Sequence, residues 1–363
     1  MLLLLADYLH RLDPFAIQFS ESFGVRWYGL AYAAGFLVAY LLGRELARRR
    51  LFAVHPDAVG DYLMAGIIGV LAGGRLGYVL FYNPSAIWTF SDSFPFWEVL
   101  AVNRGGMASH GGMIGVILAV VWFARRERLP IAHIWDVSAL LTPFGLFFGR
   151  LANFVNGELR GKPAGADFPL AVRFPQEIRE DWGVAEMRRL DEIAGDAGFT
   201  TTDWTRTLDQ AAAGDPMAYD SYLAMKERII DLLQSGSPEV TAAVEPLITP
   251  RHPSQLYQAL AEGIILATAL WLIFLVAKPK RSGWIGVGFM LIYGALRVVT
   301  EIWRTPDEGV ALVAGLSRGQ QLSAVMLLVG LVYTAYILWR PSPSPWAEPP
   351  LRSSREASMP TTS

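Results

Sequence analysis

Arginine occurs near the ends of three strongly apolar segments in this 363-residue chain. Arg75 lies in GGRLGYVLFYN, Arg150 in GRLANFVNGELRGK and Arg297 in YGALRVVTEIWRTPD. A charged side chain costs about 2.5–3.5 kcal/mol at the centre of a bilayer and less near its surface, so it usually has a partner or a function. A guanidinium group binds phosphate through two parallel hydrogen bonds. The three arginines therefore indicate a site for an anionic group such as a phospholipid headgroup.

The third of these segments carries more than one charge. At about 100° per residue, Arg297, Glu301 and Arg304 fall within about 60° of one another around a helix. Such a stripe can face the interior of a helix bundle and bind a headgroup. Two alternatives stay open: Glu301 could simply neutralise the arginines in a structural ion-pair network, and Arg75 and Arg304 could be anchors at the membrane surface.

The second segment is polar beyond its arginine. Arg150, Asn153 and Arg160 would share one face if their helix continued through Arg160. Glu158 lies in the same segment, and a carboxylate beside a phosphate site must itself be paired. The sequence does not identify its partner.

A histidine and a tyrosine add two groups that can exchange protons. His110 lies among four glycines in NRGGMASHGGM. Unperturbed imidazole titrates near pH 6.5, which suits a general base, although a hydrogen-bonding strut is equally compatible with one membrane histidine. Tyr28 stands at the start of another apolar segment.

Several kinds of chemistry are disfavoured. The chain has no cysteine, which excludes thiolate catalysis and cysteine-ligated metals. We find neither a paired-carboxylate motif nor an HExxH motif, so we expect no metal and no cofactor. Nothing indicates a nucleic-acid partner.

The elements that position these residues are apolar and long. The chain is 53% hydrophobic and only 18% charged, a composition typical of integral membrane proteins. A helix needs roughly 20 mostly apolar residues to cross a bilayer. The sequence therefore predicts an all-α, polytopic membrane protein with about seven transmembrane helices, near residues 27–47, 62–82, 106–124, 134–154, 256–277, 284–304 and 319–339.

The short loops define an orientation. Arginine and lysine cluster after the first, third, fifth and seventh spans, and such loops face the cytoplasm. The N-terminus is then outside. We expect the first fifteen residues to form a short helix at the membrane surface.

The same topology separates four parts of the chain. Residues 1–163 form the first half of the membrane core with four spans, and 251–340 the second half with three. Residues 164–250 contain 16 acidic and 7 basic residues and form a small external insertion or cap. The tail, 341–363, is rich in proline and serine and is expected to be disordered.

On this topology all the polar residues converge on the outer leaflet. That asymmetry favours an enzyme with a lateral entrance for lipid. A lipid or solute transporter with an outer-leaflet site for an anionic headgroup is the alternative, because GRLGYV and GRLANF echo each other in two parallel spans.

Six motifs resemble those of the prolipoprotein diacylglyceryl transferase family, in its order and at its approximate spacing. They are RWYGLAY, GGRLGYVLFYN, GGMASHGGMIG, PFGLFFGRLANFVNGELRGK, RHPSQLYQALAEG and YGALRVVTEIWRTPD. The resemblance runs from about Tyr28 to Arg340 and omits most of 164–250. It implies transfer of the diacylglyceryl group from phosphatidylglycerol to the lipobox cysteine of preprolipoproteins. This reaction takes place at the periplasmic side of the bacterial inner membrane and releases glycerol-1-phosphate.

The resemblance also implies roles for individual residues. Catalytic roles fall to a group of four, and headgroup binding to a larger set that shares two of them. The first group is His110, Arg150, Arg297 and Tyr28, and the second is Arg75, Arg150, Asn153, Glu158, Gly161, Arg297, Glu301 and Arg304. His110 is the candidate base for the substrate thiol.

Two features depart from the family pattern. The insertion is longer than expected, and Ala152 replaces an expected glycine. We expect activity to survive the added methyl group.

Overall fold

The computed structural model of the chain describes residues 8–20, 23–102, 105–165, 167–277, 281–306 and 315–340. It is predominantly helical and divides into two compact units, each assembled from several parts of the sequence. The first unit comprises Met1–Ala33, Leu146–Glu262 and Leu296–Ser323. The second comprises Ala34–Gly145, Gly263–Ala295 and Ala324–Ser363.

The all-α membrane architecture expected from the sequence is confirmed. Among the described residues, six helices are long and apolar enough to cross a membrane. Four of them are single α-helices, namely α1 (Trp27–Arg48), α2 (Ala58–Phe81), α4 (Ile131–Val155) and α13 (Arg318–Trp339). The other two are composite: Ser254–Ala277 contains α10 (Ser254–Gln258), η7 (Ala259–Ile265), α11 (Leu266–Leu272) and η8 (Ile273–Ala277), and Trp284–Trp303 contains α12 (Trp284–Thr300) and η9 (Glu301–Trp303).

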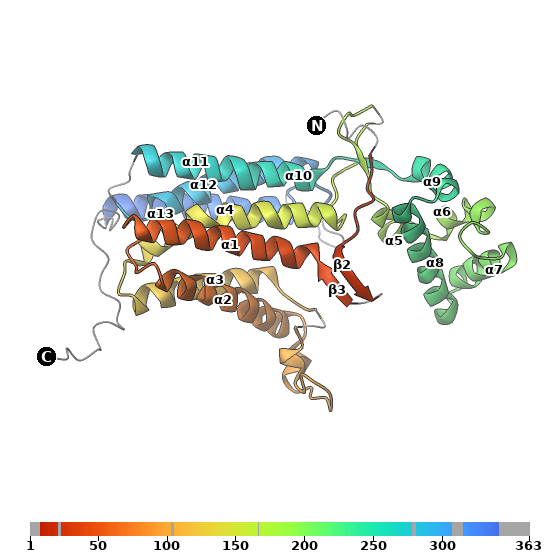
Figure 1. Ribbon diagram of the computed structural model, residues 1–363, viewed down its shortest axis with the longest axis horizontal. Coiled ribbons are helices and arrows are strands. Elements are labelled where there is room, and N and C mark those ends of the chain that lie inside the picture. Colours follow the sequence, from red (N-terminus) through yellow and green to blue (C-terminus); the bar gives the residue numbers. More distant parts are fainter. Residues whose placement is uncertain are drawn as a thin grey trace. The chain divides into compact units, whose positions relative to one another are not determined.

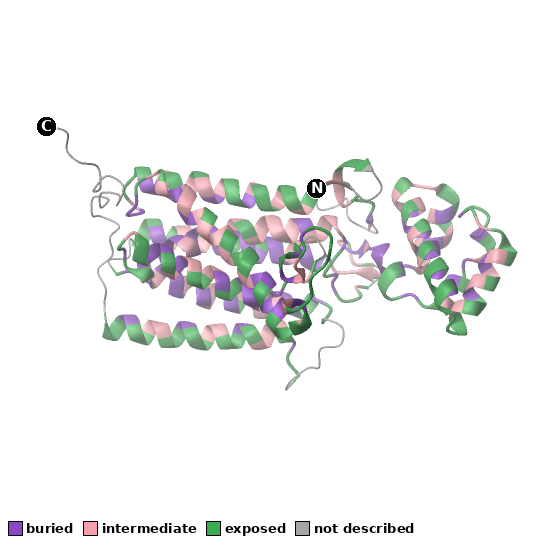
Figure 2. Cartoon of the chain, turned by 90° about the horizontal axis from the view of Figure 1, so that it is seen from below, coloured by how far each residue is buried: buried purple, intermediate pink, exposed green. Residues whose placement is uncertain are grey.

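These helices expose apolar surface that only lipid can cover. In α13 just 17% of the most apolar window is buried, and Leu328, Leu331 and Val332 are each about 60% exposed. Figure 2 shows exposed residues, in green, along most of the long helices. Soluble monomers rarely expose such continuous apolar patches, so the exposure supports a membrane protein.

The third expected span, near residues 106–124, corresponds to α3 (Ser109–Arg126), which is helical but is not among the six helices that are long and apolar enough to cross a membrane. His110 near its start and Arg125 and Arg126 at its end shorten the apolar part. It lies beside α2 (Figure 1), and glycines make that approach possible. A Cβ atom on Gly73 would lie 2.4 Å from the carbonyl oxygen of Gly111. Small residues of this kind allow membrane helices to pack backbone against backbone.

A buried carboxylate fixes the start of α12 within the second unit. Asp136 of α4 is inaccessible to solvent and accepts hydrogen bonds from the backbone nitrogens of Gly283, at 2.6 Å, and Gly286, at 2.9 Å. The first N–H groups of a helix have no partner within it, so a carboxylate from another helix can cap them.

The external insertion contains packed helices. Its α-helices are α5 (Gln176–Glu180), α6 (Val184–Arg188), α7 (Thr201–Ala212), α8 (Pro216–Ser235) and α9 (Pro238–Val244), seen as a group in Figure 1. Trp204, Leu208, Ile229 and Leu233 are fully buried in one apolar core. Asp215 caps α8 by accepting a hydrogen bond from the backbone nitrogen of Met217 at 2.9 Å, which is a common start for a helix.

The expected surface helix at the N-terminus is wrong for the residues that the structure describes. Strand β1 (Tyr8–Leu9) pairs in parallel with β4 (Val172–Arg173), which pairs with β5 (Pro250–Arg251). Strands β2 (Phe15–Ser20) and β3 (Phe23–Arg26) form a hairpin before α1. Leu9 enters the apolar core of the insertion, and this tertiary contact outweighs the local preference for a helix. Residues 1–7 and the tail 341–363 lie outside the described residues.

Candidate active site

The turn after α4 is set by two left-handed residues. α4 ends at Val155, and Gly157 and Leu159 have φ of +66° and +54°. A left-handed residue is the usual end of a helix, and glycine adopts that conformation without steric cost. The helix therefore does not continue through Arg160, and the shared face that would require this continuation does not form. Arg160 instead forms an ion pair with Glu180 at 2.6 Å.

Arg150 and Arg297 meet on one carboxylate. Glu262 accepts hydrogen bonds through Oε2 from Nε of Arg150 at 3.1 Å and from its Nη2 at 3.0 Å. Through Oε1 it accepts one from Nη1 of Arg297 at 3.0 Å. Glu262 has no exposed surface, and the side chains of Arg150 and Arg297 are only 16% and 10% exposed. The structure thus brings together the two arginines from α4 and α12, and we name these two residues the arginine clamp.

Sequence analysis did not single out Glu262. The residue lies in η7, a π-helical segment. π-helical turns are rare and often occur at functional sites, and they change the phase of every residue that follows. A periodicity of 3.6 residues therefore could not place Glu262 on the face that meets the arginine clamp.

Glu301 extends the cluster on the side of Arg297. It is 3.0 Å from Nη2 of Arg297 and 3.5 Å from Nη1 of Arg304, and it accepts a hydrogen bond from the hydroxyl of Ser317 at 3.0 Å. α12 ends at Thr300 and the chain tightens into the 3₁₀ turn η9. The three charged residues still lie within one buried network, as their spacing indicated.

Glu158 has a partner that the sequence could not identify. The hydroxyl of Tyr28, at the start of α1, donates to Oε2 of Glu158 at 2.8 Å. The side-chain amide of Asn153 in turn donates to that hydroxyl. Three residues assigned to the site from the sequence therefore form one hydrogen-bonded group, in which a neutral hydroxyl pairs with the carboxylate.

Gly161 lies where two segments of backbone approach closely. It forms an isolated antiparallel bridge with Arg304, and the backbone nitrogen of Lys162 donates to the carbonyl oxygen of Trp303 at 2.8 Å. A Cβ atom at Gly161 would lie 2.2 Å from the carbonyl oxygen of His252. The absence of a side chain lets the turn after α4 pair with the end of η9.

The other two predicted site residues belong to the second unit. Arg75 is buried and donates to the backbone oxygens of Val99 at 2.8 Å, of Gly105 at 2.7 Å and of Glu98. These contacts favour a role in anchoring the loop between α2 and α3. The imidazole of His110 contacts the rings of Phe81 and Tyr82, with centroids 5.6 and 5.8 Å away. Its role as a base stays a prediction.

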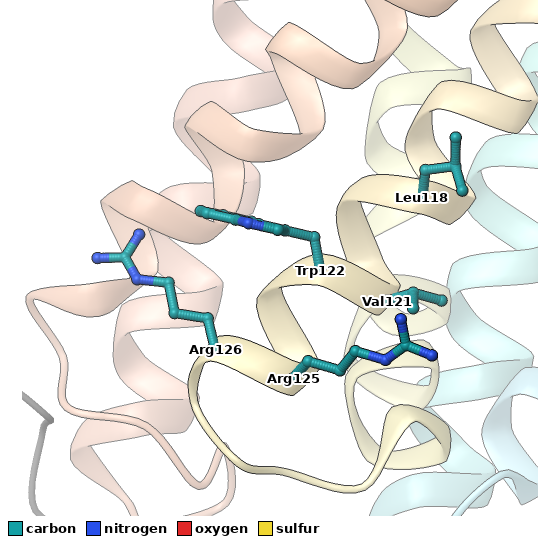
Figure 3. A pocket seen from close by; sticks show the side chains of 5 residues that line it. All are labelled: Leu118, Val121, Trp122, Arg125 and Arg126. Atoms are coloured by element: carbon teal, nitrogen blue, oxygen red, sulfur yellow. The ribbon is translucent and has the colours of Figure 1, made fainter.

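A surface pocket at the end of α3 contains none of the predicted residues. It is lined by Leu118, Val121, Trp122, Arg125 and Arg126. Arg126 extends alongside Trp122, whereas Arg125 points to the side of Val121 (Figure 3). Arg126 pairs with Asp61 at 3.0 Å. Among the described residues, no three histidine, aspartate or glutamate side chains are grouped closely enough to hold a metal ion.

The fold and these contacts define a polytopic α-helical membrane protein with a buried arginine–glutamate cluster near the ends of its helices. Comparison with known proteins identifies it further. Residues 14–336 match the family model described as Prolipoprotein diacylglyceryl transferase. The chain therefore belongs to the prolipoprotein diacylglyceryl transferase family, and it is a transferase.

Individual relatives agree with the family match. The phosphatidylglycerol–prolipoprotein diacylglyceryl transferase of Bdellovibrio bacteriovorus is 43% identical over 328 residues, which cover 89% of this chain and 92% of the relative. The enzyme of the same name from Xylella fastidiosa is 35% identical over 94% of this chain and 97% of its own. That from Azoarcus sp. is 36% identical over 88% and 92%. These similarities favour the enzyme over the transporter.

Proposed function

We propose that this protein transfers the diacylglyceryl group of phosphatidylglycerol to the lipobox cysteine thiol of preprolipoproteins, the first step of bacterial lipoprotein maturation. The relatives' names contain both the lipid and the protein substrate. The observation that carries the proposal within this chain is the arginine clamp, in which two guanidinium groups from different spanning helices meet within one buried cluster.

The reaction exchanges one bond for another. The thiol sulfur attacks the carbon of the diacylglyceryl group that carries the phosphate, and a thioether bond forms. The bond between that carbon and the phosphate oxygen breaks. The bonding electrons stay on the phosphate oxygen, and glycerol-1-phosphate leaves. Because negative charge develops on that oxygen, positively charged donors held beside it lower the barrier. In this proposal Arg150 and Arg297 are those donors.

The thiol proton needs a destination. We assign it to His110, because a neutral imidazole can act as a general base. A thiol with a pKa near 8.5 is also ionised to a few per cent at neutral pH. Solvent could then take the proton, and positioning the sulfur would be sufficient. Transfer by His110→Gln, measured against wild type across pH, separates the two routes. If His110 is the base, the activity of the variant should recover as pH rises and the thiol ionises. A loss of the same size at every pH would indicate a structural role.

The remaining residues would shape the headgroup site. Asn153 and Glu158 are joined through the hydroxyl of Tyr28, which fixes the turn after α4. Gly161 allows this turn to pair with the segment carrying Arg304. Glu301 holds Arg297 and Arg304 in one network. For Arg75 the contacts support loop anchoring more strongly than substrate binding.

The proposed location follows from the chemistry and the loop charges. The chain is a membrane protein, and we place it in the bacterial inner membrane with the site and the insertion on the periplasmic side. Arginine-rich loops such as that around Arg48 to Arg50 would then face the cytoplasm.

A transfer assay tests this function. Purified protein in phosphatidylglycerol vesicles is incubated with a lipobox peptide, and the mass of the peptide is measured. We expect one diacylglyceryl group on the cysteine and no addition to a matched peptide with serine in its place. An unmodified peptide, combined with protein-dependent movement of lipid between leaflets, would instead establish the transporter.

A further inference from the structure

Glu262 holds an unusual position for a carboxylate. It has no exposed surface, and its two oxygens are divided between the members of the arginine clamp. Within the described residues, it is the only carboxylate that contacts both Arg150 and Arg297. The hydroxyl of Thr300 lies 3.4 Å from Oε1 and completes this side of the contact. Glu262 therefore fixes the separation of the two guanidinium groups.

Glu301 does not have the same position. It contacts Arg297, Arg304 and Ser317, and none of its described contacts is with Arg150. Among the described residues, the carboxylate that contacts Arg150 is that of Glu262, which accepts hydrogen bonds from both Nε and Nη2 of the arginine. The hydrogen bonds of Arg150 to described residues come from Nε and Nη2, so the two N–H groups of Nη1 can donate to a ligand. Glu262 is thus placed to orient the clamp and to reduce its charge at the same time.

The proposed reaction changes the charge of the phosphate. The phosphodiester of phosphatidylglycerol carries one negative charge. When the carbon–oxygen bond breaks and the thiol proton departs, the resulting phosphomonoester has a second pKa near 6 and carries close to two negative charges at neutral pH. A site with more positive charge would hold the product more firmly than the substrate, because Coulomb energy is proportional to the charge of the ligand.

We propose that Glu262 is a positioning residue that limits the charge of the arginine clamp, so that it accepts a monoanionic phosphodiester and releases a dianionic phosphomonoester. This inference rests on the proposed function, because it assumes that the clamp binds the phosphate. It adds a cause for product release that the arginines alone do not provide. It also explains why an acid lies at a site for an anion, where it would otherwise only weaken binding.

The substitution Glu262→Gln tests the proposal, because it keeps the size and the hydrogen-bonding oxygen and removes the charge. Inhibition of transfer is measured with glycerol-1-phosphate, a monoester, and with glycerophosphoglycerol, a soluble diester. Since the gain in binding energy doubles with ligand charge, a gain of about threefold for the diester implies about tenfold for the monoester. We expect the inhibition constant of the monoester to fall by about tenfold and kcat to fall with it, as product release slows.

Glu262→Asp is the matched control, because it retains the charge on a shorter side chain. In this variant the ratio of the two inhibition constants, monoester to diester, should stay close to the wild-type ratio even if kcat falls. Equal changes for both inhibitors in Glu262→Gln, or no change for either, would overturn the proposal and leave Glu262 a structural residue.

A measurement on the wild-type protein keeps the proposal testable if Glu262→Gln does not fold. The monoester should inhibit wild-type transfer no more strongly than the diester, and stronger inhibition by the monoester would overturn the inference. If neither compound inhibits at all, phosphate does not bind the clamp, and it is the proposed function that fails. The two failures are therefore distinct.

Discussion

Arg150, Glu262 and Arg297 form an ion cluster that stability alone does not require. Removing charges from water is costly, and a buried ion pair is often no more stable than apolar residues of the same volume. The cost is acceptable if the charges are needed by a ligand. For this reason a buried charge inside a membrane span usually indicates a functional site, and it is usually paired with another polar group. Here that partner is Glu262.

Arg150→Lys is the first test at this scale. Lysine keeps the charge but cannot donate from two nitrogens of one plane to Oε2 of Glu262. We expect kcat/KM for peptide lipidation to fall by about 10²–10³, the usual loss when one charge-stabilising donor is removed. Arg188→Ala is the control, because this arginine forms an exposed pair with Asp209 in the insertion. Transfer by Arg150→Lys within tenfold of wild type would contradict the role.

The sequence predicted the arginines and not the acid between them. Arg150, Arg297 and Glu301 were found because a charge inside an apolar run is conspicuous. Glu262 is equally isolated in its own run, but its significance depends on contacts among three helices and on the π-helical turn η7. The sequence could not decide whether the helix continues to Arg160, because the two left-handed residues that follow Val155 show no signal in its periodicity. Backbone conformation of this kind is not encoded by periodicity.

At the scale of elements, the turn after α4 depends on Gly161. Gly161→Ala would place a Cβ atom 2.2 Å from the carbonyl oxygen of His252, and backbone on both sides leaves little room for relaxation. We expect most of the transfer activity to be lost and the free energy of unfolding to fall by about 1–3 kcal/mol. Thermal unfolding measures the second effect. Gly165→Ala in the same segment is the control, since its Cβ would meet no atom within 4 Å. Equal behaviour of the two variants would show that the close approach is unimportant.

Helices with long apolar segments were predicted well from the sequence, whereas short strands were not. Six spans were found because about 20 apolar residues in succession have few alternatives. The two-residue strands β1, β4 and β5 have too little sequence to show alternation, and their partners are more than 70 residues apart. The same reason explains why a surface helix was wrongly expected for the residues that form β1.

At the scale of the whole molecule, His10 connects the N-terminal strand to the end of α4. Its ring is fully buried, and Nε2 donates to the carbonyl oxygen of Phe154 at 2.7 Å. Burial lowers the pKa of His10 from 6.5 to about 4. Between these values the unfolded chain binds a proton that the folded chain does not, so folding stability falls as pH decreases through this window.

Acid sensitivity of the folded protein should therefore depend on His10. We expect about 3 kcal/mol of stability to be lost between pH 6.5 and pH 4, at about 1.4 kcal/mol per pH unit. Thermal unfolding in detergent at several pH values measures this loss. His10→Gln keeps a donor for Phe154 and does not titrate, so its stability should vary less over the same range. An identical pH dependence in both proteins would mean that other groups cause it.

The orientation of the whole chain can be tested because it contains no cysteine. Asp220 is exposed in α8 of the insertion, and Arg49 is exposed after α1 in an arginine-rich loop. If the insertion is periplasmic, Asp220→Cys in spheroplasts should react with a membrane-impermeant maleimide, whereas Arg49→Cys should react only after the membrane is permeabilised. Both side chains are exposed in the folded protein, so a difference in labelling reports the side of the membrane on which each residue lies. The opposite pattern would put the insertion in the cytoplasm and would reverse the side at which the arginine clamp meets its lipid.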